Sequence, residues 1–97
     1  MELFHRKQGS GPNIVILHGL FGSSDNWMSV SKMLSNDFTV WTIDQRNHGQ
    51  SPHSDEWNYE VMARDLQHFV EDHNIHEPHL IGHSMGGKTV MQFLIHE

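Results

Sequence analysis

The residues whose types and spacing most clearly suit catalysis or ligand binding are 82–89, which read GHSMGGKT. Ser84 is the serine of a G-x-S-x-G pattern, in which a tight turn between a strand and a helix presents a nucleophile. Gly87, Lys88 and Thr89 complete G-x-x-x-x-G-K-[ST], the loop that wraps phosphate groups in nucleotide-binding proteins. One pattern predicts serine-based acyl transfer and the other predicts nucleotide binding. Both need a strand before the motif and a helix after it, so the rest of the chain must decide between them.

Short apolar runs predict the strands that would position this motif. Residues 14–17 read IVIL, residues 39–43 read TVWTI, and residues 79–81 lead directly into the motif. Such runs suit strands that are buried on both faces of a sheet. A further strand-like stretch at residues 2–6 precedes them.

Three stretches between and after these strands have apolar residues at helical spacing. Asp25 or Asn26 can cap the first helix, Asn58 can cap the second, and the third begins at Met85. The expected buried stripes are Trp27, Val30 and Leu34 in the first, Tyr59, Met62, Leu66, Phe69 and Val70 in the second, and Val90, Met91 and Leu94 in the third. Strands and helices therefore alternate, which predicts a mostly parallel sheet with helices on both faces.

Three unusual loops follow the predicted strands, and they begin at His18, Asp44 and Gly82. In a parallel sheet, ligands bind outside the carboxyl ends of the strands. Because parallel strands end at the same edge, we expect these three loops to meet there and to form a site.

Composition narrows the classes of function. The 97 residues carry 12 acidic and 6 basic side chains, with a formal charge of −6. This balance disfavours nucleic acid and anionic membranes as partners. There is no cysteine for disulfide or thiol chemistry, and no run approaches the ~20 apolar residues of a membrane span. We also find no signal segment and expect a cytoplasmic protein of one domain.

The surroundings of the motif favour the serine nucleophile. A P-loop protein places its motif after an early strand and adds a later acidic strand to hold a metal ion, whereas only eight residues follow Thr89. The nucleophile pattern also gives a role to His18 and Gly19. In proteins with that pattern, the loop after an earlier strand lends one backbone N–H to an oxyanion hole, and the residue after the serine lends the other.

Three segments together resemble the α/β-hydrolase superfamily, and within it the bacterial YbfF-like esterases and their mitochondrial relatives. The segments are residues 18–23 (HGLFGS), 44–51 (DQRNHGQS) and 82–88 (GHSMGGK). The resemblance implies a three-layer α/β-hydrolase fold, of which residues 1–97 would form the N-terminal portion as a single partial domain. It also implies hydrolysis of carboxylic esters or thioesters through an acyl-enzyme, with a small-molecule ester as substrate and with no cofactor or metal.

The same resemblance implies roles for individual residues. Ser84 would be the nucleophile. The backbone N–H groups of Leu20 and Met85 would form the oxyanion hole, with the Phe21 N–H as an alternative second donor. Phe21 and His83 would line the substrate site.

Part of the expected machinery is missing from the 97 residues. In these hydrolases an acid and then a histidine follow the serine along the chain. After Ser84 only His96 and Glu97 are available. Along a helix that rises ~1.5 Å per residue, His96 lies about 18 Å from Ser84, too far to be its general base. We therefore expect the chain to be the N-terminal part of an esterase and to be catalytically incomplete by itself.

Other polar residues have simpler interpretations. We expect Asp44 to anchor its loop through backbone N–H groups, His48 and His53 to be loop residues, and Lys88 to face solvent. The triplet of His73, His76 and His79 invites a zinc interpretation, but these residues fall on a helix end, a turn and a strand start, so we expect a solvated turn. Trp57 is a candidate for the mouth of the site.

An incomplete fold also has consequences for association. By family likeness the strand at residues 79–82 lies mid-sheet, so one of its edges would be open here, and open edges recruit other chains. The isolated chain should then self-associate, swap elements with a copy, or need a complementing chain. Two alternatives to an esterase remain, a non-catalytic binding or assembly module that keeps the turn without the base, and the less favoured P-loop nucleotide binder.

Overall fold

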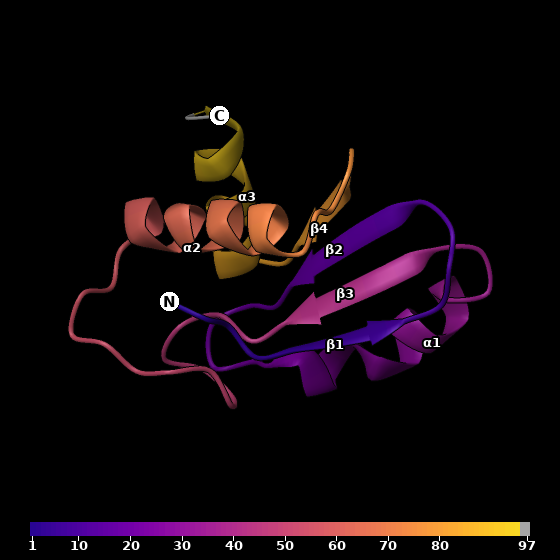
Figure 1. Ribbon diagram of the computed structural model, residues 1–97. Coiled ribbons are helices and arrows are strands. Elements are labelled where there is room, and N and C mark those ends of the chain that lie inside the picture. The colour runs from indigo at the N-terminus through magenta and orange to yellow at the C-terminus, as the bar shows by residue number, and fades with distance from the viewer. Residues whose placement is uncertain (96–97) are drawn as a thin grey trace.

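The computed structural model describes residues 1–95 of the chain as a four-stranded mixed sheet flanked by helices (Figure 1). The elements in chain order are β1 (His5–Gln8), β2 (Asn13–Leu17), the 3₁₀ helix η1 (Ser24–Trp27), α1 (Met28–Leu34), β3 (Thr39–Ile43), α2 (Tyr59–Asp72), β4 (His79–Gly82) and α3 (Met85–Ile95). The three parallel strands β2, β3 and β4 and the three α-helices lie where the apolar runs predict them, within one or two residues at most ends.

Strand pairing brings three loops to one edge of the sheet. The order is β1-β3-β2-β4, and β2 is parallel to both β3 and β4. Leu17 at the end of β2 is paired with Ile43 of β3 on one side and with Gly82 of β4 on the other. The segments after these strands therefore leave the sheet together, as the sequence predicts. β1 is antiparallel to β3, and it begins at His5 rather than at residue 2.

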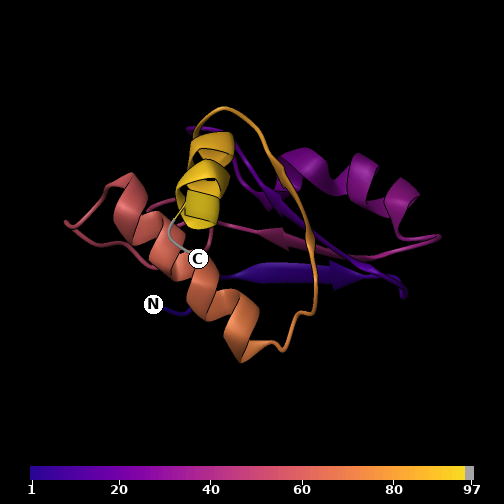
Figure 2. The ribbon, with the colours of Figure 1, turned by 90° about the horizontal axis from the view of Figure 1, so that it is seen from above.

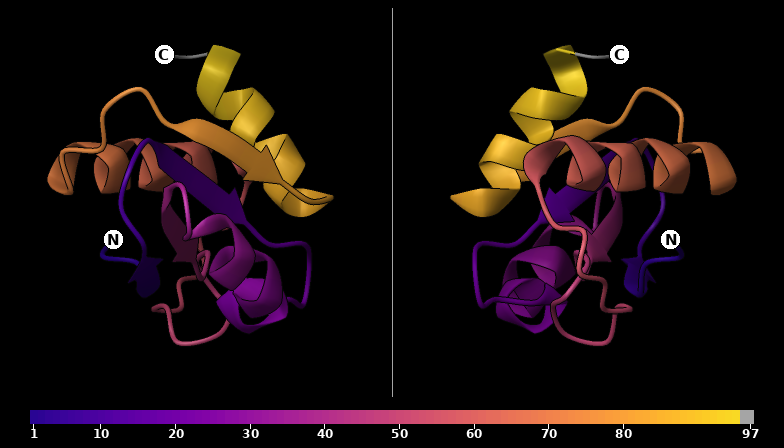
Figure 3. Two further views of the ribbon diagram at one scale, coloured as in Figure 1. Left: turned by 90° about the vertical axis from the view of Figure 1, so that its right-hand side faces the viewer. Right: turned by 90° about the vertical axis from the view of Figure 1, so that its left-hand side faces the viewer.

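The helices cover both faces of the sheet, which makes three layers (Figure 3). On one face, α2 and α3 lie side by side and cross at an angle (Figure 2). Their core residues pack against alternate sheet residues, and the buried members are Leu3, Val15, Leu17, Trp41, Ile43, Leu66, Phe69 and Ile75. On the other face, Ile14, Ile16 and Val40 are covered by Trp27 and Leu34 from η1 and α1. Alternation along β2 thus divides one apolar strand between two cores.

Two of the helix starts follow side-chain capping. Asn58 caps α2 as predicted, because its side chain accepts a 2.8 Å hydrogen bond from the Val61 N–H. The first helix differs from the expectation that Asp25 or Asn26 caps it. The structure gives that role to Ser23, and the Asn26 side chain completes a capping box by accepting from the Ser23 N–H at 2.9 Å. The helix therefore begins earlier, as a 3₁₀ turn.

The packing face of α3 also differs from the predicted stripe. Val90 is partly buried against the core, but the side chains of Met91 and Leu94 are 63% and 61% exposed. The fully buried positions of this helix are Met85, Gly86 and Thr89. Gly86 approaches the end of β2 closely, and this approach decides which face of the helix turns inward. The position of an apolar stripe in the sequence does not by itself indicate that face.

No helix in the described part of the chain combines the length and the hydropathy that a bilayer crossing requires.

Candidate active site

Ser84 lies on a sharp turn between β4 and α3 with a strained backbone. Its φ is +53°, in the left-handed region that residues with a side chain rarely adopt. Strain of this kind persists only where the surrounding structure enforces it, and it clusters at functional positions. The side chain of Ser84 is exposed at the sheet edge where the three loops meet.

Two glycines make this turn sterically possible. A Cβ on Gly82 would come within 2.5 Å of the Gly86 carbonyl oxygen, and a Cβ on Gly86 would overlap the carbonyl oxygens of Leu17 and His18. Since all of these obstacles are backbone atoms, they cannot swing aside. The glycines on either side of Ser84 are therefore packing requirements, because Gly82 abuts the first turn of α3 and Gly86 abuts the end of β2.

Backbone hydrogen bonds fix the turn but leave two donors free. The His83 N–H donates to the Leu17 carbonyl at 3.1 Å, and the Gly86 N–H donates to the His83 carbonyl at 2.9 Å. Within residues 1–95, neither the Leu20 N–H nor the Met85 N–H donates a hydrogen bond to a protein acceptor. The Met85 N–H is also at the start of α3, where the helix dipole favours negative charge.

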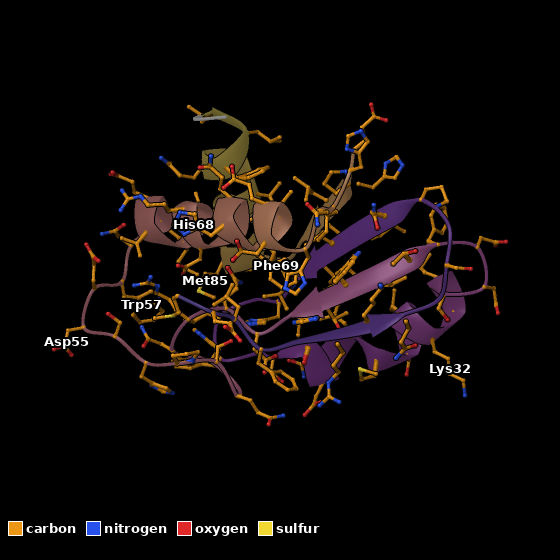
Figure 4. The ribbon with its side chains drawn as sticks, in the orientation of Figure 1. Lys32, Asp55, Trp57, His68, Phe69 and Met85 are labelled. Atoms are coloured by element: carbon orange, nitrogen blue, oxygen red, sulfur yellow. The ribbon has the colours of Figure 1, made fainter. Side chains whose placement is uncertain are left out.

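Two hollows flank Ser84. The first has a volume of about 380 Å³ and is lined by Leu20, Trp57, Asn58, Tyr59, Met62, Ser84, Met85 and Lys88. The second has a volume of about 450 Å³ and is lined by Gly19, Leu20, Gly22, Asn26, Trp27, Val30, His83 and Ser84. Ser84 and Leu20 are the residues that border both. Figure 4 marks Trp57, on the loop before α2, and Met85, at the start of α3, which contribute to the first hollow from separate elements.

The other residues expected near the serine behave differently from one another. His83 borders the second hollow, where its ring centroid lies 6.3 Å from that of Trp27 and its Nδ1 lies 2.8 Å from the position that a Cβ on Gly19 would take. Phe21, expected to line the substrate site, borders neither hollow: it is 91% exposed, and its φ is +62°. Lys88 is exposed as predicted but also borders the first hollow, with its Nζ 5.9 Å from the Tyr59 ring centroid.

No histidine among residues 1–95 forms a hydrogen bond with Ser84. His96, which we expect to lie too far from Ser84 to be its general base, and Glu97 both fall outside the described residues.

Asp44 anchors the loop after β3, as predicted. Its carboxylate accepts hydrogen bonds from the Ser24 N–H at 2.6 Å and from the Gln50 N–H at 2.9 Å. The Ser51 hydroxyl donates to the backbone carbonyl oxygen of Asp44 and accepts a hydrogen bond from the Phe4 N–H at 2.8 Å. One buried carboxylate thus joins the loops after β2 and β3.

A buried polar chain next to Ser84 is absent from the sequence prediction. The His18 ring accepts a 3.0 Å hydrogen bond at Nε2 from the Gln45 N–H, and the Gln45 side chain donates to the His18 carbonyl at 2.9 Å. The Thr89 hydroxyl donates to the Gln45 Oε1 at 3.0 Å. Burial lowers the pKa of His18, against the opposing effect of its hydrogen bond to the Gly19 carbonyl, and this shift favours the neutral ring.

An ion pair holds the long loop that carries Trp57. Arg46 donates to both carboxylate oxygens of Asp65 on α2, at 2.7 and 2.9 Å, and to the Glu56 carbonyl at 2.7 Å. Both side chains are almost fully buried. The hydrogen bonds that Arg46 donates to Asp65 raise the pKa of its guanidinium above the ordinary value. His48, on the same loop, packs between the His18 and Trp57 rings, with centroid distances of 5.0 and 5.8 Å.

The histidine triplet forms no metal cluster. His73 packs against the His5, Trp41 and Phe69 rings at centroid distances of 4.6, 5.3 and 4.4 Å, so it belongs to an aromatic cluster and not to a solvated turn. Burial and the neighbouring His73 lower the pKa of His5. Across residues 1–95, no group of three or more histidine or acidic side chains could hold a metal ion.

Comparison with known proteins places this geometry in a family. A sequence model of the α/β-hydrolase fold matches residues 12–97. The chain belongs to the α/β-hydrolase family. An esterase from a marine microorganism has a TM-score of 0.94 and 55% sequence identity, and the match covers 96% of this chain and 36% of that one.

Curated relatives of this α/β hydrolase carry several activities in their names. A probable alcohol acetyltransferase of Saccharomyces cerevisiae is 46% identical over 87% of this chain and 26% of its own length. The sn-1-specific diacylglycerol lipase ABHD11 of Mus musculus is 49% identical over 82% and 27%. Esterase YbfF of Escherichia coli is 44% identical over 89% and 34%, which confirms the resemblance to YbfF-like esterases. The chain therefore spans about a quarter to a third of these relatives.

Proposed function

We propose that these residues carry the nucleophile and the oxyanion hole of a serine hydrolase that cleaves carboxylic esters through an acyl-enzyme. The observation that carries the proposal is the setting of Ser84. It sits on a strained turn at the junction of two hollows, beside the free N–H groups of Leu20 and Met85. A helix cap needs neither the hollows nor the free donors.

In the proposed reaction, the Ser84 Oγ attacks the ester carbonyl carbon while a histidine from outside residues 1–95 takes its proton. The carbonyl oxygen becomes an oxyanion that accepts hydrogen bonds from the Leu20 and Met85 N–H groups. Loss of one such donor costs about 2.7–4 kcal/mol of transition-state stabilisation in other hydrolases. The alcohol leaves with a proton from the histidine, and water then releases the acid from Ser84.

The substrate proposed is a small ester, because the two hollows have volumes of about 380 and 450 Å³ and meet at Ser84. Their walls are largely apolar, with Leu20 and Trp57 on one side and Trp27 and Val30 on the other. The reacting carbon of an ester carries an acyl chain on one side and an alcohol group on the other, and each hollow would receive one of these two groups.

The test uses the full-length protein that contains these residues and p-nitrophenyl acetate or butyrate as substrate. Ser84→Ala should reduce turnover by orders of magnitude with little change in unfolding, and a fluorophosphonate should label Ser84 in the unaltered protein. Ser29→Ala, at an exposed position of α1, is the matched control. Near-normal turnover in Ser84→Ala would overturn the assignment. Absence of both turnover and labelling would favour the non-catalytic binding module.

A second acceptor for the acyl group is favoured by two relatives. The probable alcohol acetyltransferase of S. cerevisiae and ethanol acetyltransferase 1 of Hanseniaspora uvarum are each 46% identical to this chain. An acyl-enzyme on Ser84 can pass its acyl group to an alcohol instead of water. Adding ethanol to the esterase assay and measuring ethyl ester by gas chromatography distinguishes transfer from hydrolysis.

We also propose that the outer edge of β4 and the exposed side of α3 are covered in the working protein by the part of the fold that the longer relatives contain. In the described sheet β4 pairs on one side only, and Met91, Leu94 and Ile95 on α3 are 61–71% exposed. Unpaired edges and contiguous apolar surface recruit other chains. The isolated 97 residues should therefore self-associate in sedimentation experiments, and a stable monomer of 11.2 kDa would contradict this proposal.

A further inference from the structure

A buried chain of polar side chains runs behind the proposed oxyanion hole. It joins His18 after β2, Gln45 after β3, and Thr89 on α3, and each residue is at least 97% buried. None of the three borders either hollow beside Ser84. These side chains take no part in the proposed reaction. Polar groups that are buried so completely are nearly always hydrogen-bonded, and the hydrogen bonds of these three residues indicate what they do.

The hydrogen bonds fix which nitrogen of the His18 ring carries its proton. A backbone N–H can only donate, so the Gln45 N–H at 3.0 Å requires an unprotonated Nε2. The proton of the neutral ring must then lie on Nδ1, which is 2.7 Å from the Gly19 carbonyl oxygen. The ring therefore donates to Gly19, and Gln45 selects the tautomer that allows it to do so.

The acceptor of this hydrogen bond is one end of the peptide unit that ends in the Leu20 N–H. Peptide units are planar, and none in the described chain is cis, so the Gly19 carbonyl and the Leu20 N–H point in opposite directions. The Gly22 N–H holds the same carbonyl at 3.0 Å. With the carbonyl fixed from behind by two donors, the Leu20 N–H is fixed in front.

Thr89 joins this arrangement to the helix that follows Ser84. Its hydroxyl lies 3.0 Å from the Gln45 Oε1 and 3.2 Å from the Met85 carbonyl, one turn earlier on α3. The Gln45 amide in turn donates to the His18 carbonyl at 2.9 Å. The loop with the first proposed donor and the helix with the second are thus tied through one glutamine side chain.

We infer that His18, Gln45 and Thr89 are positioning residues, which hold the Leu20 N–H in register with the Met85 N–H for the oxyanion. The inference rests on the proposed function, because it gives these residues a role in catalysis through the two donors. Small errors in such geometry are costly, since displacement by about 1 Å can reduce a rate about 100-fold.

The decisive experiment compares two substitutions of His18 in the full-length protein. Asparagine can place an N–H where Nδ1 lies but cannot reach the Gln45 N–H. Glutamine can place an acceptor near Nε2 but offers no donor to Gly19. We expect His18→Gln to lower kcat for p-nitrophenyl butyrate about 10- to 100-fold with little change in KM, and His18→Asn to retain more kcat. A role in packing alone would favour the larger glutamine, so equal or reversed losses would overturn the inference.

Two further measurements test the inference even if both His18 variants fail to fold. Thr89→Val keeps the shape of the side chain but removes its hydrogen bond, so kcat should fall about 3- to 10-fold, and Thr89→Ser should restore it. In the unaltered protein, ¹⁵N NMR should find the His18 proton on Nδ1 near pH 7. A proton on Nε2, or full activity in Thr89→Val, would contradict the inference.

The controls separate this inference from the proposed function. Failure of the unaltered protein to hydrolyse esters or to be labelled at Ser84 would overturn the proposed function itself. Normal labelling with unchanged kcat in all variants would overturn only the positioning role. His53→Gln, on the exposed part of the loop after β3, should leave kcat unchanged.

Discussion

Removal of the negative charge from Asp65 tests how the structure holds the loop that borders the candidate site. Asp65→Asn keeps the size of the side chain but leaves the Arg46 guanidinium without a carboxylate. The side chains of this pair are 8% and 6% exposed, with N–O distances of 2.7 and 2.9 Å. Breaking such a buried pair costs about 3–5 kcal/mol, because the remaining charge stays desolvated. Since an asparagine oxygen still accepts one hydrogen bond, we expect a loss of about 3 kcal/mol.

The assay is urea unfolding of the full-length protein, in which the loss appears as a lower midpoint at an unchanged m-value. The chain offers a matched control in the same helix. Glu60 and Arg64 form an exposed ion pair at 3.0 Å, and Glu60→Gln should cost no more than about 0.5 kcal/mol. Combining Arg46→Met with Asp65→Leu should recover most of the loss, since no unpaired charge then remains.

Equal costs for Asp65→Asn and Glu60→Gln would refute the reasoning, because burial of the Arg46–Asp65 pair would then add nothing to the cost of breaking it. A double variant that is no more stable than Asp65→Asn would refute the explanation by an unpaired charge. In that case, the packing of the arginine stem and its hydrogen bond to the loop would account for the effect instead.

Three other perturbations have definite expected outcomes. Gly86→Ala should cost more than about 2 kcal/mol in urea unfolding, because its Cβ would overlap the carbonyl oxygens of Leu17 and His18, whereas Gly87→Ala, with its nearest contact at 3.2 Å, should cost less. Equal costs would show that the turn can relax. Stability should fall as the pH drops below the ordinary His18 pKa of 6.5, by at most about 1.4 kcal/mol per pH unit for this group, because burial makes the folded state bind the proton more weakly than the unfolded chain. Unfolding of His18→Asn across this range should show a shallower pH dependence, and an unchanged slope would exclude His18 as a cause. ATP or GTP with magnesium should leave Tm unchanged, since α3 already begins at Met85 and residues 85–87 therefore form no loop that could wrap a phosphate. A saturable rise in Tm that disappears in Lys88→Ala would restore the nucleotide interpretation.

The sequence predicts the sheet and the position of the site because both depend on local patterns. The apolar runs in β2 and β3 are too short and too β-branched to suit helices, and their parallel pairing follows from the helices between them. The meeting of the loops after Leu17, Ile43 and Gly82 is then a geometric necessity. Asp44, at the end of a buried strand, has little else to bind except backbone N–H groups.

The sequence does not predict contacts between residues that are distant along the chain. Nothing near His18 indicates that the Gln45 N–H will meet its ring, or that Thr89 will complete the polar chain, since these contacts arise only when β2, β3 and α3 pack. His73 is misjudged for the same reason, because its aromatic neighbours come from β1, β3 and α2. The inward face of α3 depends on how closely Gly86 approaches β2, which is a property of the tertiary structure.

The two proposed oxyanion donors have a consequence for how this site can diversify. Both are main-chain groups, so any amino acid except proline at positions 20 and 85 retains them. The side chains of Leu20 and Met85, in contrast, form part of the wall of the first hollow. Mutation at these two positions can therefore reshape the space offered to an ester while leaving the charge-stabilising groups intact. Preference for one substrate over another could drift or be engineered there without first sacrificing the chemistry.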